Sequence, residues 1–328
     1  MTDKERYREL CREEVSIPVY SRDWWLDCVC GEANWDVLLS TRRKQIEAAM
    51  PYYIHGKGVI SMPPYTQTMG VWFNPAFCCV HYHKELYRKQ TICKNFIERL
   101  PAHDYFYQQF HYSFTDWLPF YWNGFSQTTR YTYVFPDIGN PDELLEEMNR
   151  NIRRNIQRAK NHYQLTVRRN VPVDIFLKVS IQTYQRQGMK PYQPELLKRL
   201  IAVSRSRKQG DIWGTYDEND RLFAAVFIVW QENCAYYIAG GYINNWQTSG
   251  GLALSIWTAI NDLSGQVRSF DFEGSMIQGI EDFFRGFGAL QQPYFAIEKG
   301  ELSLLTRKKL SLFQKVRTKF FNIIKIMR

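Results

Sequence analysis

The chain has 328 residues, 45% of them hydrophobic and 23% charged, and it contains no low-complexity tract, which excludes a disordered or fibrous protein. The formal net charge is +9, but residues 301–328 hold eight basic residues against one acidic residue, so the rest of the chain is nearly neutral. The basic character therefore belongs to the tail and is not a nucleic-acid footprint spread over the whole fold. The longest apolar run, Leu222 to Trp230, is far shorter than the ~20 residues needed to span a bilayer.

Several classes of protein are disfavoured by missing signals. The amino terminus, MTDKERYREL, is charged and lacks the apolar stretch of a secretory signal, and the seven cysteines lack the spacing of a disulfide framework. We therefore expect reduced thiols and a cytoplasmic location. The run Cys78 to His83 matches no known zinc spacing, so no metal is expected. The absence of a Walker loop, a nucleophile elbow and an HExxH motif argues against an NTPase, a serine hydrolase and a zinc protease.

The first 140 residues predict short strands interrupted by helices and aromatic loops. Residues 1–30 have a helical and then irregular pattern with Trp24 and Trp25 as anchors, and residues 84–100 have the periodicity of a helix. Residues 65–79 are expected to form a loop. Runs rich in apolar and aromatic residues predict the strands Trp35–Ser40, Ile46–His55, Val59–Met62, Asp104–His111 and Arg130–Phe135.

A long helix is predicted from Asn140 to about His162. It starts with a cap residue, a proline at the first helical position and acids in the first turn. Its apolar residues form one stripe, and the opposite side is basic, with Arg150, Arg153, Arg154, Arg158 and Lys160. One interpretation is a solvated basic face. The other is a surface that receives an anionic substrate or carrier, with Arg154 as a substrate-binding candidate.

The second half of the chain has the predicted element order β-α-α-β-β-β-α-β-α-β. The first three predicted helices of this half are Val173–Gln187, Pro194–Arg205 and Gly250–Leu263. The predicted strands are Leu165–Arg168, Asp211–Tyr216, Leu222–Gln231, Ala235–Gly241 and Ser269–Glu273. The second, third and fourth of these strands follow one another directly, and the turns between them are short enough for antiparallel hairpins. The helix after them lets the next strand lie parallel to its predecessor.

The stretch RSFDFEGSMIQGIEDFFRGFGALQQPYFAI (268–297) predicts a strand, a tight turn, a helix, a glycine-rich exit and another strand. In the first strand the phenylalanines face one way, and the two acids, Asp271 and Glu273, face the other. Ser275 and Gln278 have the spacing of a capping box, so a helix is expected to begin there. Two carboxylates therefore end a strand at the edge where ligands gather in open α/β sheets. The alternative is a surface pair held by the capping donors.

This element order resembles the GNAT acyltransferase fold, and four stretches resemble its FemAB-like branch and the related acetyltransferase-6 group. The stretches are SMPPYTQTMG (61–70), WLPFYWNGFSQTTRYTYVF (117–135), MNRNIRRNIQRAKN (148–161) and FDFEGSMIQGIEDFFRGFGA (270–289). The resemblance implies an α+β fold with two GNAT-like lobes, 1–140 and 141–300, each with a mixed central sheet flanked by helices. It places a cleft between the lobes and a basic helix at 301–328 after them.

The resemblance also implies transfer of an acyl or aminoacyl group onto an amine. FemAB-like enzymes use an aminoacyl-tRNA donor and a peptidoglycan precursor, whereas acyl-CoA donors and polysaccharide or lipid-linked acceptors occur in the wider group. GNAT enzymes that use CoA bind its pyrophosphate at a helix amino terminus through a Gln/Arg-x-x-Gly-x-Gly/Ala loop. The equivalent stretch here holds Gln247, Ser249, Gly250 and Gly251, but Leu252 occupies the position of Gly or Ala. Plain helix capping is the alternative.

Acyl transfer requires a neutral amine held against a carbonyl group. Glu273 and Asp271 are the candidate bases, because burial and a neighbouring carboxylate both raise a carboxyl pKa. Tyr236 and Tyr237 lie on the preceding strand, and Tyr237 is the candidate proton donor for the leaving group, with core packing as the alternative. We expect this strand and the one that carries the two acids to separate, which would leave a slot for the activated thioester or ester.

Further contacts are expected away from the two acids. Arg130, Tyr131 and Lys190 are substrate-binding candidates for an anionic donor or acceptor, with exposed salt bridging as the alternative for the two basic residues. Residues 301–328 have the pattern of a basic amphipathic helix on an anionic membrane, or of a terminal helix docked on the first lobe. The leading hypothesis is a cytoplasmic enzyme at the inner membrane face that acylates a cell-envelope precursor. The alternatives are an acyl-CoA N-acetyltransferase for a small soluble amine and a non-catalytic protein that binds RNA or anionic lipid.

Overall fold

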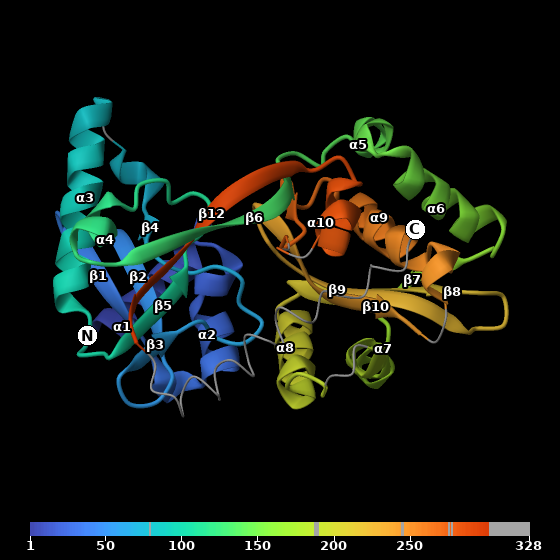
Figure 1. The fold of residues 1–328 in the computed structure, drawn as a ribbon, viewed down its shortest axis with the longest axis horizontal. Helices are drawn as coiled ribbons and strands as arrows, with labels where there is room; N and C mark the ends of the chain where they lie inside the picture. Colours follow the sequence, from blue (N-terminus) through green and yellow to red (C-terminus); the bar gives the residue numbers. More distant parts are fainter. Residues whose placement is uncertain (79, 187–189, 244–245, 275, 277, 302–328) are drawn as a thin grey trace. The chain divides into compact units, whose positions relative to one another are not determined.

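The computed structural model describes residues 1–301 except 79, 187–189, 244–245, 275 and 277 (Figure 1). The chain divides into two compact units. Among the described residues, unit 1 holds Met1–Arg130 and 293–301, and unit 2 holds Tyr131–Gln292. These borders differ from the expected lobes because they fall inside the strands β6 (Ser126–Phe135) and β12 (Leu290–Gly300), and the end of β12 pairs within unit 1. The basic helix predicted for the tail lies outside the described residues.

Unit 1 is built on a mixed sheet with the strand order β1-β2-β3-β5-β12, and a short strand, β4, pairs with β2. The strands are β1 (Trp35–Arg42), β2 (Gln45–Ile54), β3 (Val59–Ser61), β4 (Trp72–Phe73), β5 (Tyr105–Gln109) and β12 (Leu290–Gly300). The helices are α1 (Asp3–Glu13), α2 (Asp23–Cys30), α3 (Tyr82–Arg99) and α4 (Leu118–Trp122). Trp24 and Trp25 are buried, as predicted. The loop expected over 65–79 is wrong at β4, because two residues are too short a run to show alternation.

Unit 2 has the strand order β6-β11-β10-β9-β8-β7. The strands are β6 (Ser126–Phe135), β7 (Thr166–Arg169), β8 (Gly210–Tyr216), β9 (Leu222–Gln231), β10 (Cys234–Tyr242) and β11 (Ser269–Asp271). The helices are α5 (Pro141–Glu147), α6 (Arg150–Asn161), α7 (Val173–Arg186), α8 (Pro194–Ser206), α9 (Gly251–Leu263) and α10 (Gln278–Arg285). Strands β8, β9 and β10 form antiparallel hairpins, and β11, which follows the crossover helix α9, is parallel to β10. Both pairings confirm the prediction.

Helices cover both faces of the unit 2 sheet. Alternate residues of β9 show this, because Val226 and Ile228 join the hydrophobic cluster under α6, α9 and α10, whereas the Phe227 ring lies 6.3 Å from Phe176 of α7. In Figure 1, α9 and α10 lie on one side of the strands and α7 and α8 on the other. Because both faces of the strand are covered, both sets of alternating side chains must be apolar, and β9 is accordingly a continuous apolar run.

The helix predicted over 140–162 is two helices, so the prediction of one continuous helix is wrong. The break falls at Met148 and Asn149, where Met148 turns into the core. The Asn149 side chain accepts from the Ile152 N–H at 2.8 Å and so caps α6, while its own backbone N–H donates to the Gly286 carbonyl at 2.9 Å. The second cap was hidden in the sequence because the helical periodicity continues across the break.

Candidate functional site

The centre of unit 2 holds a fork between two parallel strands. β10 and β11 pair only through Cys234–Ser269, Ala235–Phe270 and Tyr236–Asp271. Beyond that point β10 continues to Tyr242 beside β9, whereas the chain after β11 follows β6, where the Phe272 N–H donates to the Tyr133 carbonyl at 2.9 Å. We call residues 236–242 and 271–274 the strand fork. The separation expected from the sequence is therefore present.

A β-bulge accompanies the fork. Tyr237 pairs with Ile228 and Ala239 with Phe227, so Ile238 is an extra residue in β10. A bulge bends its strand and increases the local twist. This bulge follows directly after the last pair with β11, and it therefore accounts for the divergence. The bulged residue of β10 is Ile238, and its position could not be derived from the sequence.

Asp271 lies at the last paired position of the fork and is 2% exposed. Its Oδ1 accepts a hydrogen bond from the Thr132 hydroxyl of β6 and one from the Glu273 backbone N–H at 2.8 Å. Burial raises the pKa of Asp271 to about 6, against the lowering effect of these two donors. The expectation of a surface pair is therefore wrong for Asp271. Its carboxyl group changes charge close to neutral pH, as a general base requires.

Glu273 and Gly274 form a left-handed turn after β11. Glu273 has φ +59°, and Gly274 has φ +42°. A Cβ atom on Gly274 would lie 2.1 Å from the Tyr131 carbonyl oxygen and 2.3 Å from the Thr132 Cα. The turn therefore presses the backbone against β6, and this contact is open only to glycine. Strained backbone of this kind persists where the surroundings hold it in place, and it is frequent at functional sites.

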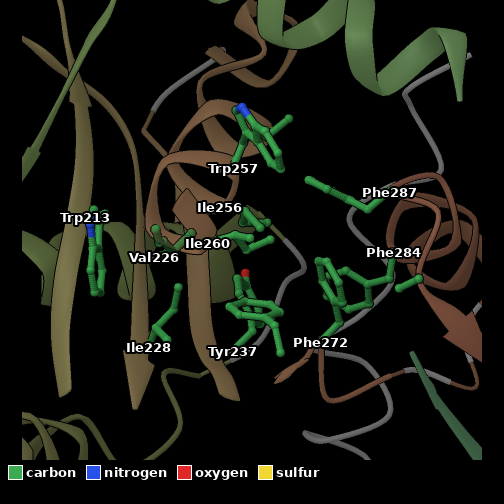
Figure 2. Packing of buried hydrophobic residues seen from close by; sticks show 14 of the residues in the cluster. Trp213, Val226, Ile228, Tyr237, Ile256, Trp257, Ile260, Phe272, Phe284 and Phe287 are labelled. Carbon is green, nitrogen blue, oxygen red and sulfur yellow. The ribbon is translucent and has the colours of Figure 1, made fainter. Parts of the chain in front are cut away.

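Tyr236 and Tyr237, at the start of the fork, face opposite sides of the sheet. Tyr237 lies in the hydrophobic cluster with its ring centroid 5.5 Å from that of Phe284, and Figure 2 shows it among core side chains. Tyr236 pairs with Asp271, and paired residues of neighbouring strands face the same side. The structure therefore brings Asp271 together with Thr132, Glu273 and Tyr236. It does not bring Asp271 together with Tyr237.

In the glycine loop before α9, Ser249 caps the helix and Gly250 packs against α6. The Ser249 hydroxyl accepts from the Gly251 N–H at 3.1 Å and donates to the Trp246 carbonyl at 2.7 Å. Gly250 has φ +80°, and a Cβ there would lie 2.0 Å from the Asn155 carbonyl oxygen of α6. Close packing against α6 thus explains Gly250 without a phosphate. The side chain of Gln247 lies outside the described residues.

The other candidate residues are spread over both units. Arg130 of β6 is half-buried, and its Nε is buried without a hydrogen-bond partner among the residues described in the structure. Tyr131, the next residue along β6, contributes the carbonyl oxygen that Gly274 approaches. Lys190 is exposed between α7 and α8, and Arg154 is exposed on α6. None of these four residues contacts Asp271 through an interaction seen in the described chain.

Thr132 was not singled out in the sequence, because its role depends on β6 pairing with β11 across more than 130 residues. We expect Thr132→Val to raise the pKa of Asp271, since the variant removes a hydrogen bond that favours the charged form. Hydrogen bonds to charged groups are worth about 1.5–3 kcal/mol, so the pH–rate profile of transfer should move upward by about one to two pH units. Thr132→Ser keeps the hydroxyl and should retain the wild-type profile. An unchanged profile in the valine variant would contradict this role.

Comparisons with known proteins place the chain in a class. Residues 147–285 match the family model described as "Acetyltransferase (GNAT) domain". The solved structure of FemX is similar over 94% of this chain and 98% of its own, at 10% identity and a TM-score of 0.68. The C-terminal domain of a protein described as a lysylphosphatidylglycerol synthetase from Agrobacterium fabrum is similar over 96% and 98%, at 10% identity and a TM-score of 0.54. A tandem GNAT protein of clavulanic acid biosynthesis is similar over 92% and 97%, at 8% identity and a TM-score of 0.50. No curated protein matches the chain.

Residues 147–285 thus carry a GNAT-type acyltransferase domain, and the chain has the fold of GNAT acyltransferases. Its mixed sheets flanked by helices follow the architecture of FemX and of tandem GNAT proteins. Within the part of the chain that the structure describes, every helix is too short or too polar to cross a bilayer.

Proposed function

We propose that the protein transfers an acyl or aminoacyl group from an activated donor onto an amine of a cell-envelope or lipid-linked acceptor, at the strand fork of unit 2. The observation that carries the proposal is the position of Asp271, a buried carboxyl group with a raised pKa where β10 and β11 part. Beyond Tyr236, β11 offers no pairing partner to β10. An extended donor chain can use such an open strand edge by backbone hydrogen bonding.

Asp271 acts as the general base in this proposal. The carboxylate takes a proton from the acceptor ammonium group, and the neutral amine attacks the carbonyl carbon of the donor. The tetrahedral intermediate collapses with cleavage of the C–S or C–O bond to the donor, and the thiolate or alkoxide leaving group takes up a proton. The nitrogen of the new amide releases its second proton, which restores the group that protonated the leaving group. Thr132 holds the carboxylate in place, and Tyr236, on the same side of the sheet, is the proposed donor of the proton to the leaving group. Glu273 is the alternative base, because it belongs to the same turn.

We favour an aminoacyl ester over acyl-CoA as the donor. Leu252 occupies the position where a CoA-binding loop has Gly or Ala, and Gly250 packs on the Asn155 carbonyl. The room that a pyrophosphate would need at this helix end is thus partly taken by α6. The proteins named FemX and lysylphosphatidylglycerol synthetase share the fold, which supports an aminoacyl donor and an envelope or lipid acceptor. In the proposal the enzyme acts in the cytoplasm at the inner membrane face, and Arg130, Tyr131 and Lys190 contact the anionic groups of its substrates.

The second candidate is an acyl-CoA N-acetyltransferase for a small amine. It is favoured by the Ser249 cap at the amino terminus of α9, which is the type of helix end that binds phosphate. In this version Ser249, Gly250 and Gly251 hold the pyrophosphate, together with Gln247.

A donor screen separates the two candidates. Thermal unfolding of the full chain is measured with acetyl-CoA, with bulk aminoacylated tRNA and with the same tRNA deacylated. Stabilisation by aminoacylated tRNA, together with transfer of its labelled amino acid to an amine, supports the proposal. Stabilisation and transfer with acetyl-CoA alone would replace it by the second candidate. If neither donor gives transfer, the proposed function fails.

A further inference from the structure

Helix α6 carries a row of cations, which we call the α6 stripe: Arg150, Arg153, Arg154, Arg158 and Lys160, of which Arg158 is half-buried and the other four are exposed. Within the described chain, no acidic side chain forms an ion pair with any of them, although fourteen ion pairs occur elsewhere. The contacts that Arg154 and Arg158 do make are to the Asn151 side-chain oxygen, at 3.3 Å, and to the Thr248 carbonyl, at 2.9 Å. The stripe is therefore a concentrated positive charge that the protein itself leaves unneutralised.

This arrangement weakens the helix that carries it. The first turn of α6 holds no acid and begins with Arg150, so cations lie at the positive end of the helix dipole. Arg150 with Arg154, and Arg154 with Arg158, are like charges four residues apart, which repel one another. Stability alone would select the opposite charges at these positions. A bound polyanion would reverse the sign of each of these effects.

The carboxyl end of the stripe borders a surface hollow of about 480 Å³, lined by Arg154, Gln157, Arg158, Asn161, His162 and Tyr163. Guanidinium and amide donors lie there beside the rings of His162 and Tyr163. The Tyr163 ring is supported from behind by Trp246, whose ring centroid lies 6.1 Å away. Guanidinium forks suit bidentate phosphate contacts, and aromatic rings suit base stacking. Arg158 also joins the hollow to the loop that precedes α9.

We propose that the α6 stripe docks the phosphodiester backbone of a structured RNA, and that the hollow at its end accepts an unstacked base. The inference rests on the proposed function, because the RNA would be the carrier of the activated acyl group. A membrane surface fits less well. The apolar side of α6, with Ile152, Ile156 and Ala159, is buried in the core, so no apolar face is left to enter a bilayer.

The test uses a triple variant, Arg150→Gln/Arg153→Gln/Arg154→Gln, and a control of equal charge change, Lys178→Gln/Arg199→Gln/Lys208→Gln, at exposed positions elsewhere in unit 2. Binding of labelled, deacylated bulk tRNA is measured by fluorescence anisotropy over a range of salt concentrations. The stripe variant should bind at least tenfold more weakly, and the slope of log K against log[salt] should fall by about 2–3, while the control stays near wild type. Thermal melting should find the stripe variant at least as stable as the wild type.

Three binding results would overturn the inference: equal losses in both variants, no RNA binding by the wild type, or lost binding to anionic vesicles with RNA binding unchanged. The proposed function is tested separately with Asp271→Asn, which should bind RNA like the wild type. RNA binding through the stripe without any acyl transfer by the wild type would refute the proposed function alone. Transfer from aminoacylated tRNA that is unaffected in the stripe variant would refute the inference alone.

Discussion

The Asp271→Asn variant is expected to transfer acyl groups at least about 100-fold more slowly than the wild type, and yet to be more stable at pH 8. The loss follows from removing a general base, which is typically worth about 10²–10⁴ in rate. The gain follows from removing a charge that the fold buries. The pKa of Asp271 is about 6 in the folded protein against 3.8 for a free aspartate, so the folded state binds the proton more tightly than the unfolded state. Its contribution to stability is greatest below pH 4, declines as the pH rises to about 6, and stays flat above.

The two pKa values differ by about 2, which corresponds to at most about 3 kcal/mol at pH 8. Chemical denaturation of both proteins at pH 4 and pH 8 measures this directly. The wild type should lose stability between the two pH values relative to the variant. Glu232→Gln, at an exposed hairpin position, is the matched control and should change neither rate nor stability. A variant that is both less stable at pH 8 and fully active would contradict the assigned role.

The second large effect is expected at Gly274. In Gly274→Ala the new methyl group would overlap the Tyr131 carbonyl oxygen and the Thr132 Cα, which are backbone atoms that cannot move without shifting β6. The cost should be about 3–5 kcal/mol, of which about 1 kcal/mol reflects the positive φ and the rest overpacking. A shift of β6 should also break the hydrogen bond between Thr132 and Asp271. The free energy of unfolding and the pH–rate profile report the two consequences.

Gly265→Ala is the control for the Gly274 prediction. Gly265 also has a positive φ, +81°, but nothing lies within 4 Å of the added methyl group. This variant should cost only about 1 kcal/mol and leave the pH–rate profile unchanged. Equal costs at the two glycines would mean that the turn after β11 does not press on β6.

Local patterns in the sequence were sufficient for most of unit 2. The hairpins from β8 to β10, the crossover through α9 and the burial of Phe272 follow from alternation, turn chemistry and helical periodicity, which act within a few residues. The position of two acids at the end of β11 followed from the same alternation. These features are local, and they reach the fold with little dependence on the rest of the chain.

Features that depend on distant pairing could not be predicted. Thr132 becomes a partner of Asp271 only because β6 lies beside β11, and the Ile238 bulge is defined only by its mismatch with β9. Alternation places Tyr236 and Tyr237 on opposite faces, but only the register of β10 against β11 shows that Tyr236 is the one on the side of Asp271. The close approach of Gly250 to Asn155 likewise depends on the packing of α6 on the loop before α9.

The most direct test of the account is a structure of the protein with a non-hydrolysable analogue of its acyl donor. The carbonyl group of the analogue should lie at the strand fork, beside β10 after Tyr236 and within hydrogen-bonding reach of an amine held by Asp271. An analogue bound elsewhere in unit 2, with the fork closed by side chains and Asp271 out of reach of the carbonyl carbon, would contradict the account.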